Sequence, residues 1–191
     1  MQIILASQSP RRRELMGLFH LPFTVQVAQV DETMIPGRDP AGEVARVSRL
    51  KARAVSPQPE DVVIAADTIV VCDGKILGKP HSDREAREML ALLSGRAHQV
   101  MTGVTVRRGD REETFTEITQ VYFRRLSQRE IAAYVETGEP MDKAGAYAIQ
   151  GGAALFVQRL EGDYFNVVGL PVCRLWETLQ LFLEDSMEEG T

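Results

Sequence analysis

The chain has little cysteine and histidine, and it lacks the spacings in which these residues bind metals. Its 191 residues include two cysteines and three histidines. Cys72 and Cys173 form no CxxC or CxxH pattern, which argues against a zinc site or a redox dithiol. Each lies in an apolar run and is expected to fill space in the core. Unpaired cysteines of this kind suit a reducing cytosol.

Long hydrophobic runs and a surplus of basic charge are also missing. No apolar stretch approaches the roughly 18 residues that cross a membrane, and no basic segment followed by an apolar one marks a signal peptide. The chain is therefore expected to be soluble and cytoplasmic, without a membrane partner. Its net charge of −5 argues against a nucleic-acid partner, because such proteins need a basic face.

Common nucleotide and hydrolase motifs are absent as well. The chain contains no Walker A, GxGxxG, HExxH or GxSxG pattern. This excludes the P-loop, Rossmann, zinc-protease and hydrolase-elbow interpretations, so any nucleotide or phosphate chemistry must use another arrangement.

What is present is the composition of a folded domain, 44% hydrophobic and 26% charged. We expect one domain over residues 1–191, in one lobe or two, with an acidic, frayed tail at 184–191. Hydrophobic spacing predicts a mixed twisted central sheet flanked by helices, an α/β or α+β fold. Strands are expected at 3–6, 23–27, 62–71, 98–107, 114–124 and 153–160. Helices are expected at 10–20, 41–55, after Ser82, from Ser127 to about 137, and at 171–183.

Near the N-terminus, the sequence places positive charge where a helix disfavours it. Ser9 is a suitable N-cap, and Pro10 fits the first helical position. Arg11, Arg12 and Arg13 follow in the first turn, where the helix dipole disfavours each cation by roughly 0.3–1 kcal/mol. A sequence that departs from local helix preference in this way usually does so at a functional site. Helix N–H groups and arginine guanidinium groups bind phosphate oxygens, so the ligand expected here is a polyanion.

Two charged residues interrupt segments that should be buried. Asp67 lies within the apolar strand at 62–71, and Lys51 falls on the apolar side of the helix at 41–55. A buried carboxylate is costly unless it is paired or bound to a metal, so Asp67 is either a structural residue or a functional one. Lys51 either extends its charged end to the surface or meets a buried anion.

Further polar residues lie near the expected strand ends. Lys79, held extended by Pro80, lies either beside the Asp67 site or on the open surface. Glu32 follows a strand, and oxygen ligands such as Glu32 and Asp67 suit Mg²⁺.

A loop rich in small residues, at 142–152, includes Gln150. Glycines allow backbone to approach a ligand closely, and the Gln150 amide can donate to and accept from a base edge. Ordinary turns have the same composition, so the loop alone does not decide between the two interpretations.

Together these segments resemble one protein family, the Maf family of septum-formation-type nucleoside triphosphate pyrophosphatases. The resemblance runs in order from about residue 2 to 176. The segments that carry it are Leu5-Ala6-Ser7-x-Ser9-Pro10-Arg11-Arg12, Lys51-Ala52, Ala66-Asp67-Thr68, Gly78-Lys79-Pro80, Ser94-Gly95, Thr102-Gly103, residues 142–151, and Asn166-Val167-Val168-Gly169-Leu170-Pro171.

The resemblance implies a fold like that of inosine triphosphate pyrophosphatases and a cytoplasmic homodimer. It also implies cleavage of dTTP, UTP and modified pyrimidine triphosphates between the α and β phosphates, with Mg²⁺ or Mn²⁺. At the matching positions, the resemblance implies that Asp67 is the catalytic proton acceptor, assisted by Lys51 and Lys79, and that Glu32 and Asp67 bind the metal. It implies that the phosphates are bound by Ser7, Arg11, Arg12, Lys51 and Lys79. It implies that substrate specificity depends on Arg11, Thr68 and Gln150.

Other functions remain as alternatives at this stage. A branch of the same family acts on 7-methyl-GTP, and it would carry a different residue after Asp67 and a Ser-Glu-Gly-like end to the later loop. A nucleotide-sensing regulator of cell division that binds without hydrolysis is disfavoured, because every expected catalytic position is occupied. A nucleic-acid-binding division factor is disfavoured by the acidic charge balance.

Overall fold

The structure, a computed structural model, describes residues 1–27 and 29–188, which form two compact units. The first unit comprises Met1–Asp67, Thr102–Glu117 and the segment from Gly169, and the second comprises Thr68–Met101 and Ile118–Val168. The boundary passes through three long strands, so each of these strands contributes residues to both units.

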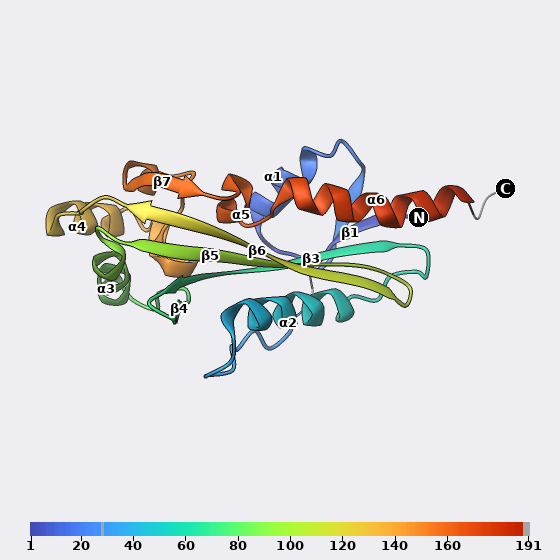
Figure 1. Cartoon of the computed structure of the whole chain (residues 1–191), viewed down its shortest axis with the longest axis horizontal. Coiled ribbons are helices and arrows are strands. Elements are labelled where there is room, and N and C mark those ends of the chain that lie inside the picture. Colours follow the sequence, from blue (N-terminus) through green and yellow to red (C-terminus); the bar gives the residue numbers. More distant parts are fainter. Residues whose placement is uncertain (28, 189–191) are drawn as a thin grey trace. The chain divides into compact units, whose positions relative to one another are not determined.

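The strands form a mixed seven-stranded sheet in the order β2-β1-β3-β5-β6-β7, with β4 paired to β3 (Figure 1). β1 pairs in parallel with both β2 and β3, whereas the β3–β4 and β6–β7 pairs are antiparallel. The expected mixed α/β fold class is therefore confirmed. The strands are β1 (Ile3–Leu5), β2 (Phe23–Val25), β3 (Val62–Cys72), β4 (Lys75–Leu77), β5 (Ala97–Arg108), β6 (Arg111–Phe123) and β7 (Val157–Glu161).

In the first unit, helices cover both faces of the strands. α2 (Pro40–Arg53) lies on one face and α6 (Val172–Glu188) on the other (Figure 1). α2 is held to β5 by a hydrogen bond of 2.8 Å between the hydroxyls of Ser48 and Thr105. The third helix of this unit, α1 (Pro10–Gly17), follows β1 directly.

The contact between α2 and β5 is closest at Gly103. A Cβ atom at this position would lie 2.5 Å from the carbonyl oxygen of Val44, which is far inside van der Waals contact. Only glycine therefore allows the helix to rest on the strand at this distance. Small and branched apolar residues from β1, α2 and β3 complete a cluster in this unit: Ile4, Ala6, Ala52, Val55, Val63 and Ala65.

The second unit has its own core, in which aromatic rings meet edge to face. His98 and Phe123 have ring centroids 4.9 Å apart, and Tyr147 contacts both rings. This geometry is the one that aromatic quadrupoles favour. The helical segments of this unit are α3 (Asp83–Leu93), α4 (Gln128–Glu136), α5 (Tyr164–Val168) and the short 3₁₀ turns η1 (Glu139–Asp142), η2 (Ala144–Ala146) and η3 (Gly152–Leu155). Within the described ranges, no helix is long and apolar enough to cross a membrane.

Helix starts follow the serine caps expected from the sequence. Ser127 forms a capping box at the start of α4, with Glu130 returning the hydrogen bond. At α3, Ser82 accepts from the backbone N–H of Glu85 as expected. The Glu85 carboxylate, however, accepts from the N–H of His81 rather than from that of the cap itself.

Several predictions are wrong. Cys173, expected in the core, is exposed on α6. The helix expected at 10–20 ends at Gly17, and the strand expected at 23–27 ends at Val25. The strand expected at 153–160 begins only at Val157, because residues 152–155 form the turn η3, whose Ala-Ala pair has little preference for strand. The terminal helix expected to end near 183 continues to Glu188, since no glycine or proline interrupts it before Gly190. The frayed tail at 184–191 stays a prediction, and residues 189–191 lie outside the described ranges.

Candidate functional site

The three parallel strands of the first unit bring polar residues to one edge. β1 lies between β2 and β3, so the carboxyl ends of all three point the same way. Ser7 comes directly after β1, Glu32 lies in the loop after β2, and Asp67 lies in β3 beyond the residues that pair with β1. Ligand sites in sheets of this kind form at that edge.

Alternation along β3 turns Asp67 toward α2. Side chains two apart on a strand share a face. Val63 and Ala65 belong to the cluster that includes Ala52 of α2, so Asp67, two residues further on, faces the same helix. The residue is 7% exposed, and a carboxylate buried this far needs a positive partner.

That partner is Lys51, on the buried stripe of α2. Its Nζ donates a hydrogen bond of 2.8 Å to Oδ1 of Asp67 and lies 3.0 Å from Oε2 of Glu32. Lys51 is 9% exposed, so it meets a buried anion and does not extend to the surface. Two carboxylates around one ammonium offset the cost of burying it.

Arg12 is the second buried cation of this unit. Its Nε donates to the carbonyl oxygen of Gly169 at 2.8 Å, and its Nη1 donates to the hydroxyl of Ser7 at 3.2 Å. Burial lowers the pKa of Arg12, while the charges of Asp67 and Glu32 act in the opposite direction and raise it. The guanidinium is therefore fixed in place and lies within the electrostatic reach of both carboxylates.

The neighbouring arginines differ in their surroundings. Arg11 is half-buried, and its Nε is a buried donor that has no hydrogen-bond partner in the described part of the chain. Arg13 is exposed. A buried guanidinium donor without an acceptor is unfavourable, and an anion bound beside α1 would supply the missing acceptor.

The loop that carries Glu32 is held by a pair that the sequence analysis missed. Oε2 of Glu43 accepts from the backbone N–H of Ile35 at 2.8 Å, and Nη2 of Arg46 donates to the carbonyl oxygen of Thr33 at 2.8 Å. Hydrogen bonds from Arg46, and then from Ile35, lower the pKa of Glu43 to about 2. The only signal in the sequence was an i, i+3 acid–base spacing at the start of α2.

The carboxylates of Glu32 and Asp67 suit a divalent cation. Both approach one point, which the Lys51 ammonium now occupies. Among the described residues, no three His, Cys, Asp or Glu side chains form a complete metal cage. Mg²⁺ commonly binds one or two carboxylates and takes its other ligands from water and substrate phosphates, so this donor set fits it.

The remaining predicted site residues lie in the second unit. Thr68 is half-buried, and Lys79 and Gln150 are exposed. A hydrogen bond of 3.0 Å from the N–H of Gly145 to the carbonyl oxygen of Gly78 ties the loop of Gln150 to the segment of Lys79. The structure thus groups the nine predicted residues as six in the first unit and three in the second.

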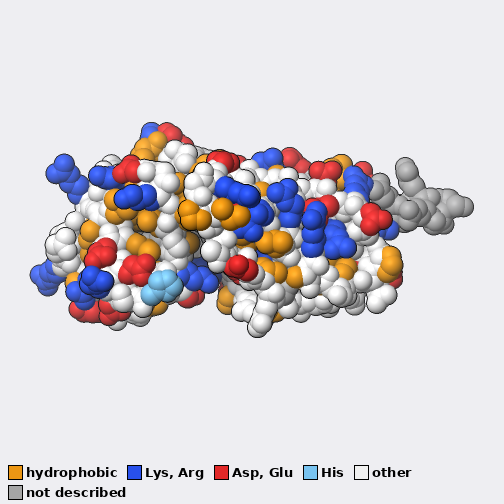
Figure 2. Space-filling view, turned by 90° about the horizontal axis from the view of Figure 1, so that it is seen from below, with side chains coloured by type: hydrophobic (Ala, Val, Ile, Leu, Met, Phe, Trp, Pro, Cys, Tyr) orange, Lys and Arg blue, Asp and Glu red, His pale blue; other side chains and the backbone are white. Residues whose placement is uncertain are grey.

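Basic side chains also gather on the outer side of α2. Figure 2 looks onto this side of the molecule and shows Lys and Arg over the helix. Two of the arginines are paired, Arg46 with Glu43 and Arg53 with Glu112, each at 2.8 Å. The first unit therefore has a local positive surface in a chain whose net charge is −5, which favours the approach of anions.

The chain was compared with protein families, with curated proteins and with solved structures. Residues 2–182 match the family model described as Maf-like protein. The chain is 52% identical to a dTTP/UTP pyrophosphatase of Bacillus pumilus, with 95% of this chain and 96% of that protein covered. It is 54% identical to a dTTP/UTP pyrophosphatase of Symbiobacterium thermophilum, with 95% of this chain and 94% of that protein covered. Among solved structures, a HAM1 protein from Coxiella burnetii is 15% identical, with a TM-score of 0.46 and coverage of 82% and 91%.

Proposed function

The chain belongs to the Maf-like protein family, and on that premise we propose that it hydrolyses dTTP, UTP and modified pyrimidine triphosphates to the monophosphate and pyrophosphate. Relatives of nearly equal length, about half identical to it, bear the name dTTP/UTP pyrophosphatase. Every position that carries the family resemblance at the site is occupied by a residue of the expected chemistry.

One observation carries the proposal: buried Lys51 joins the buried carboxylate of Asp67 to the exposed carboxylate of Glu32, within electrostatic reach of Arg12. Burying charges of both signs is costly and is seldom needed for stability alone. Clusters of opposite charge that are largely removed from water are typical of functional sites. The Nε of Arg11, which has no hydrogen-bond partner among the described residues, adds a donor that suits a phosphate oxygen.

In this proposal the phosphate chain is bound by cations and by the start of α1. Arg11 presents a planar guanidinium to phosphate oxygens, and Arg12, held by Gly169 and Ser7, adds a fixed positive charge. Lys51 and Lys79 add point charges, and Ser7 adds a hydroxyl. The positive dipole end of α1 favours the same anion. These groups hold the substrate and stabilise the negative charge that develops as the phosphoanhydride breaks.

Asp67 is the proposed proton acceptor. Its carboxylate takes a proton from a water molecule as the water oxygen attacks phosphorus at the α–β linkage. The bridging P–O bond then breaks, and pyrophosphate leaves with the electron pair. A divalent cation, Mg²⁺ or Mn²⁺, held by Glu32 and Asp67, would supply charge neutralisation for the triphosphate.

The base is assigned to Arg11, Thr68 and Gln150. The Gln150 amide can donate to and accept from a pyrimidine edge, and Thr68 follows the catalytic carboxylate directly in β3. Replacement of Gln150 by alanine should reduce discrimination between bases more than it reduces turnover. Equal losses on all nucleotides would contradict the role of Gln150 in reading the base.

Further parts of the proposal concern partners and location. We propose a homodimer in the cytoplasm that binds neither nucleic acid nor membranes. The family resemblance supports the dimer, the net charge of −5 argues against nucleic acid, and the free cysteines Cys72 and Cys173 suit a reducing compartment.

The test is a substrate panel with product identification. The purified protein is assayed on dTTP, UTP, CTP, GTP and 7-methyl-GTP with Mg²⁺ or Mn²⁺, and products are separated by ion exchange. Monophosphate plus pyrophosphate from dTTP and UTP supports the proposal. If the products are diphosphate and phosphate, the proposed cleavage between the α and β phosphates is wrong. A preference for 7-methyl-GTP would favour the other branch of the family. Nucleotide binding without turnover would indicate a sensor.

A further inference from the structure

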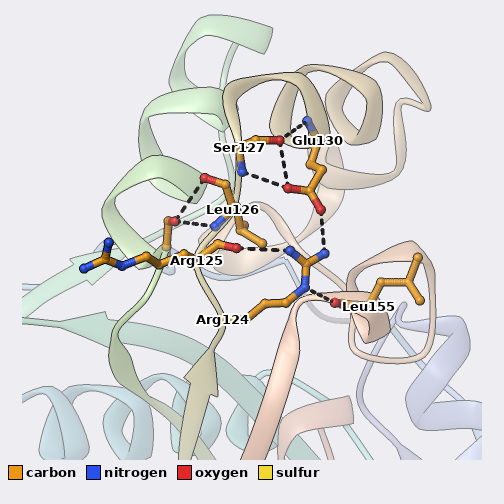
Figure 3. A network of polar contacts seen from close by, with 7 residues as sticks. Arg124, Arg125, Leu126, Ser127, Glu130 and Leu155 are labelled. Atoms are coloured by element: carbon orange, nitrogen blue, oxygen red, sulfur yellow. Dashed lines mark hydrogen bonds and ion pairs between the residues drawn. The ribbon is translucent and has the colours of Figure 1, made fainter.

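α4, which leads into the loop of Gln150, is anchored at its first turn. Arg124, at the end of β6, donates to Oε1 of Glu130 at 2.7 Å and to the carbonyl oxygens of Leu155 and Arg125 at 2.8 Å and 3.0 Å (Figure 3). Figure 3 also shows the Ser127 capping box on the same carboxylate. A helix tied at this end can hold a side chain of its later turns at a fixed place.

Tyr134 is that side chain. It is buried, and its hydroxyl donates to Oε1 of Glu139 at 2.7 Å. The same hydroxyl oxygen accepts from the backbone N–H of Ala148 at 3.1 Å. The phenol therefore joins α4 to the loop at a point two residues before Gln150.

The Glu139 carboxylate completes the connection on the other side of Gln150. Its Oε2 accepts from the N–H of Gly152 at 3.2 Å, two residues after Gln150. A Cβ atom on Gly151 would lie 2.1 Å from Oε1 of Glu139, so the carboxylate sits directly against the backbone next to Gln150. The glycine allows this close approach.

The loop held in this way has a strained backbone. Ala146 has φ of +61°, in the left-handed region that non-glycine residues rarely adopt. Gly145 beside it has φ of +68°, and its absent Cβ leaves room for Val70. Such a conformation persists only where surrounding contacts enforce it, and the bonds from Tyr134 and Glu139 are contacts of that kind.

We propose that Tyr134 and Glu139 are positioning residues that set base selectivity by holding the main chain on both sides of Gln150. The inference rests on the proposed function, in which Gln150 reads a pyrimidine. A side-chain amide discriminates between bases only if its backbone is already in place, because ordering a free loop at binding costs affinity. The pair binds backbone N–H groups on both sides of Gln150, so its effect is expected on recognition of the base.

The experiment compares two tyrosine-to-phenylalanine variants of the full chain. Tyr134→Phe removes both hydrogen bonds of the phenol and keeps its ring. Tyr122→Phe is the matched control, because the Tyr122 hydroxyl also bonds a glutamate, Glu161, at 2.7 Å within the same unit. For Tyr134→Phe we expect about a tenfold lower kcat/KM on UTP and dTTP, mostly through KM, and less than about a twofold change on CTP and GTP. Tyr122→Phe should leave all values within about twofold.

A double variant separates positioning from a general loss of structure. In a Gln150→Ala background, Tyr134→Phe should cause no further loss of selectivity, because the pair acts through Gln150. Equal losses on every nucleotide, or an additive loss in the double variant, would overturn the inference. If Tyr134→Phe does not fold, Glu139→Gln provides the same comparison. A wild-type protein without preference for UTP and dTTP would instead refute the proposed function, so the two failures are distinguishable.

Discussion

The Nζ of Lys51 lies 2.8 Å from the Asp67 carboxylate, and both side chains are about 10% exposed. Glu32 shares the ammonium at 3.0 Å, but its own side chain is 54% exposed. The lysine thus has one buried and one accessible partner. The Glu32 side of the ammonium is therefore the side open to solvent.

Loss of the Asp67 carboxylate should abolish turnover. We expect Asp67→Asn to lower kcat by about 10²–10⁴-fold, because the amide cannot accept a proton from water. Nucleotide binding, measured by calorimetry, should survive within about tenfold. Asp61→Asn is the control: this carboxylate is also buried, but it accepts from the N–H groups of Gln2 and Gln58 and should affect stability alone.

Arg12 should not tolerate lysine. Its fork binds the Gly169 carbonyl and the Ser7 hydroxyl at once, and an ammonium on a flexible stem cannot reproduce both contacts. We expect Arg12→Lys to lower kcat/KM by at least about tenfold, with thermal stability also reduced. Arg13→Lys, on the exposed side of the same turn, should behave like the wild type. A nearly unchanged Arg12→Lys enzyme would contradict the assigned role.

Metal removal should stop the reaction. Treatment with a chelator is expected to eliminate turnover, and Mg²⁺ or Mn²⁺ to restore it. Glu32→Gln should raise the Mg²⁺ concentration needed for half-maximal activity by about 10–100-fold, and metal binding followed by calorimetry should weaken in parallel. Asp31→Asn is the adjacent control, since the Asp31 carboxylate caps the N–H of Thr33 and is exposed.

His98 should make stability depend on pH. Burial lowers its pKa from 6.5 to about 4 in the folded chain. Between these values the unfolded chain binds a proton that the folded chain does not, so the free energy of unfolding falls as pH drops through this range. Neutral His98 makes its full contribution to the free energy of unfolding above about pH 6.5. By about pH 4 the free energy of unfolding has fallen by on the order of 3 kcal/mol.

Urea unfolding across this pH range measures the effect. His98→Gln should flatten the pH dependence, whereas His81→Gln, at an exposed position, should retain the wild-type slope. An identical slope in His98→Gln and the wild type would show that other groups cause the dependence.

Gly103 should be irreplaceable in the first unit. In Gly103→Ala the new methyl would meet the Val44 carbonyl at 2.5 Å, so α2 and β5 must separate. We expect the free energy of unfolding to fall by at least about 2 kcal/mol, measured by chemical denaturation. Gly17→Ala, at the end of α1 with no atom within 4 Å of the new Cβ, should change it by less than about 0.5 kcal/mol.

Local signals in the sequence were enough for most elements. Ser9 and Ser127 cap the helices expected to follow them, and β3 occupies the apolar run around Asp67. The strand β4, the turns η1 to η3 and the short helix α5 were missed, because segments of three to five residues carry too little periodicity to be recognised. Their conformation depends on contacts with distant residues, such as that of Gly145 with Gly78.

The site was predictable in part, for a related reason. Lys51 and Asp67 are anomalies in their own segments, and a charge in an apolar context is visible without a structure. Glu43 and Tyr134 are ordinary residues on amphipathic helices, so nothing in their local sequence marks the bonds they make. The backbone groups that these side chains bind are set by the conformation of the loops. Patterns in a single sequence do not show that conformation.

The bond between Arg12 and the carbonyl of Gly169 joins two segments that are far apart in the order of synthesis. The acceptor is made 157 positions after the arginine. A nascent chain can form β1 and α1 long before this bond exists. A chain that stops before Gly169 therefore lacks the acceptor that holds the Arg12 guanidinium in place, even where β1 and α1 have formed.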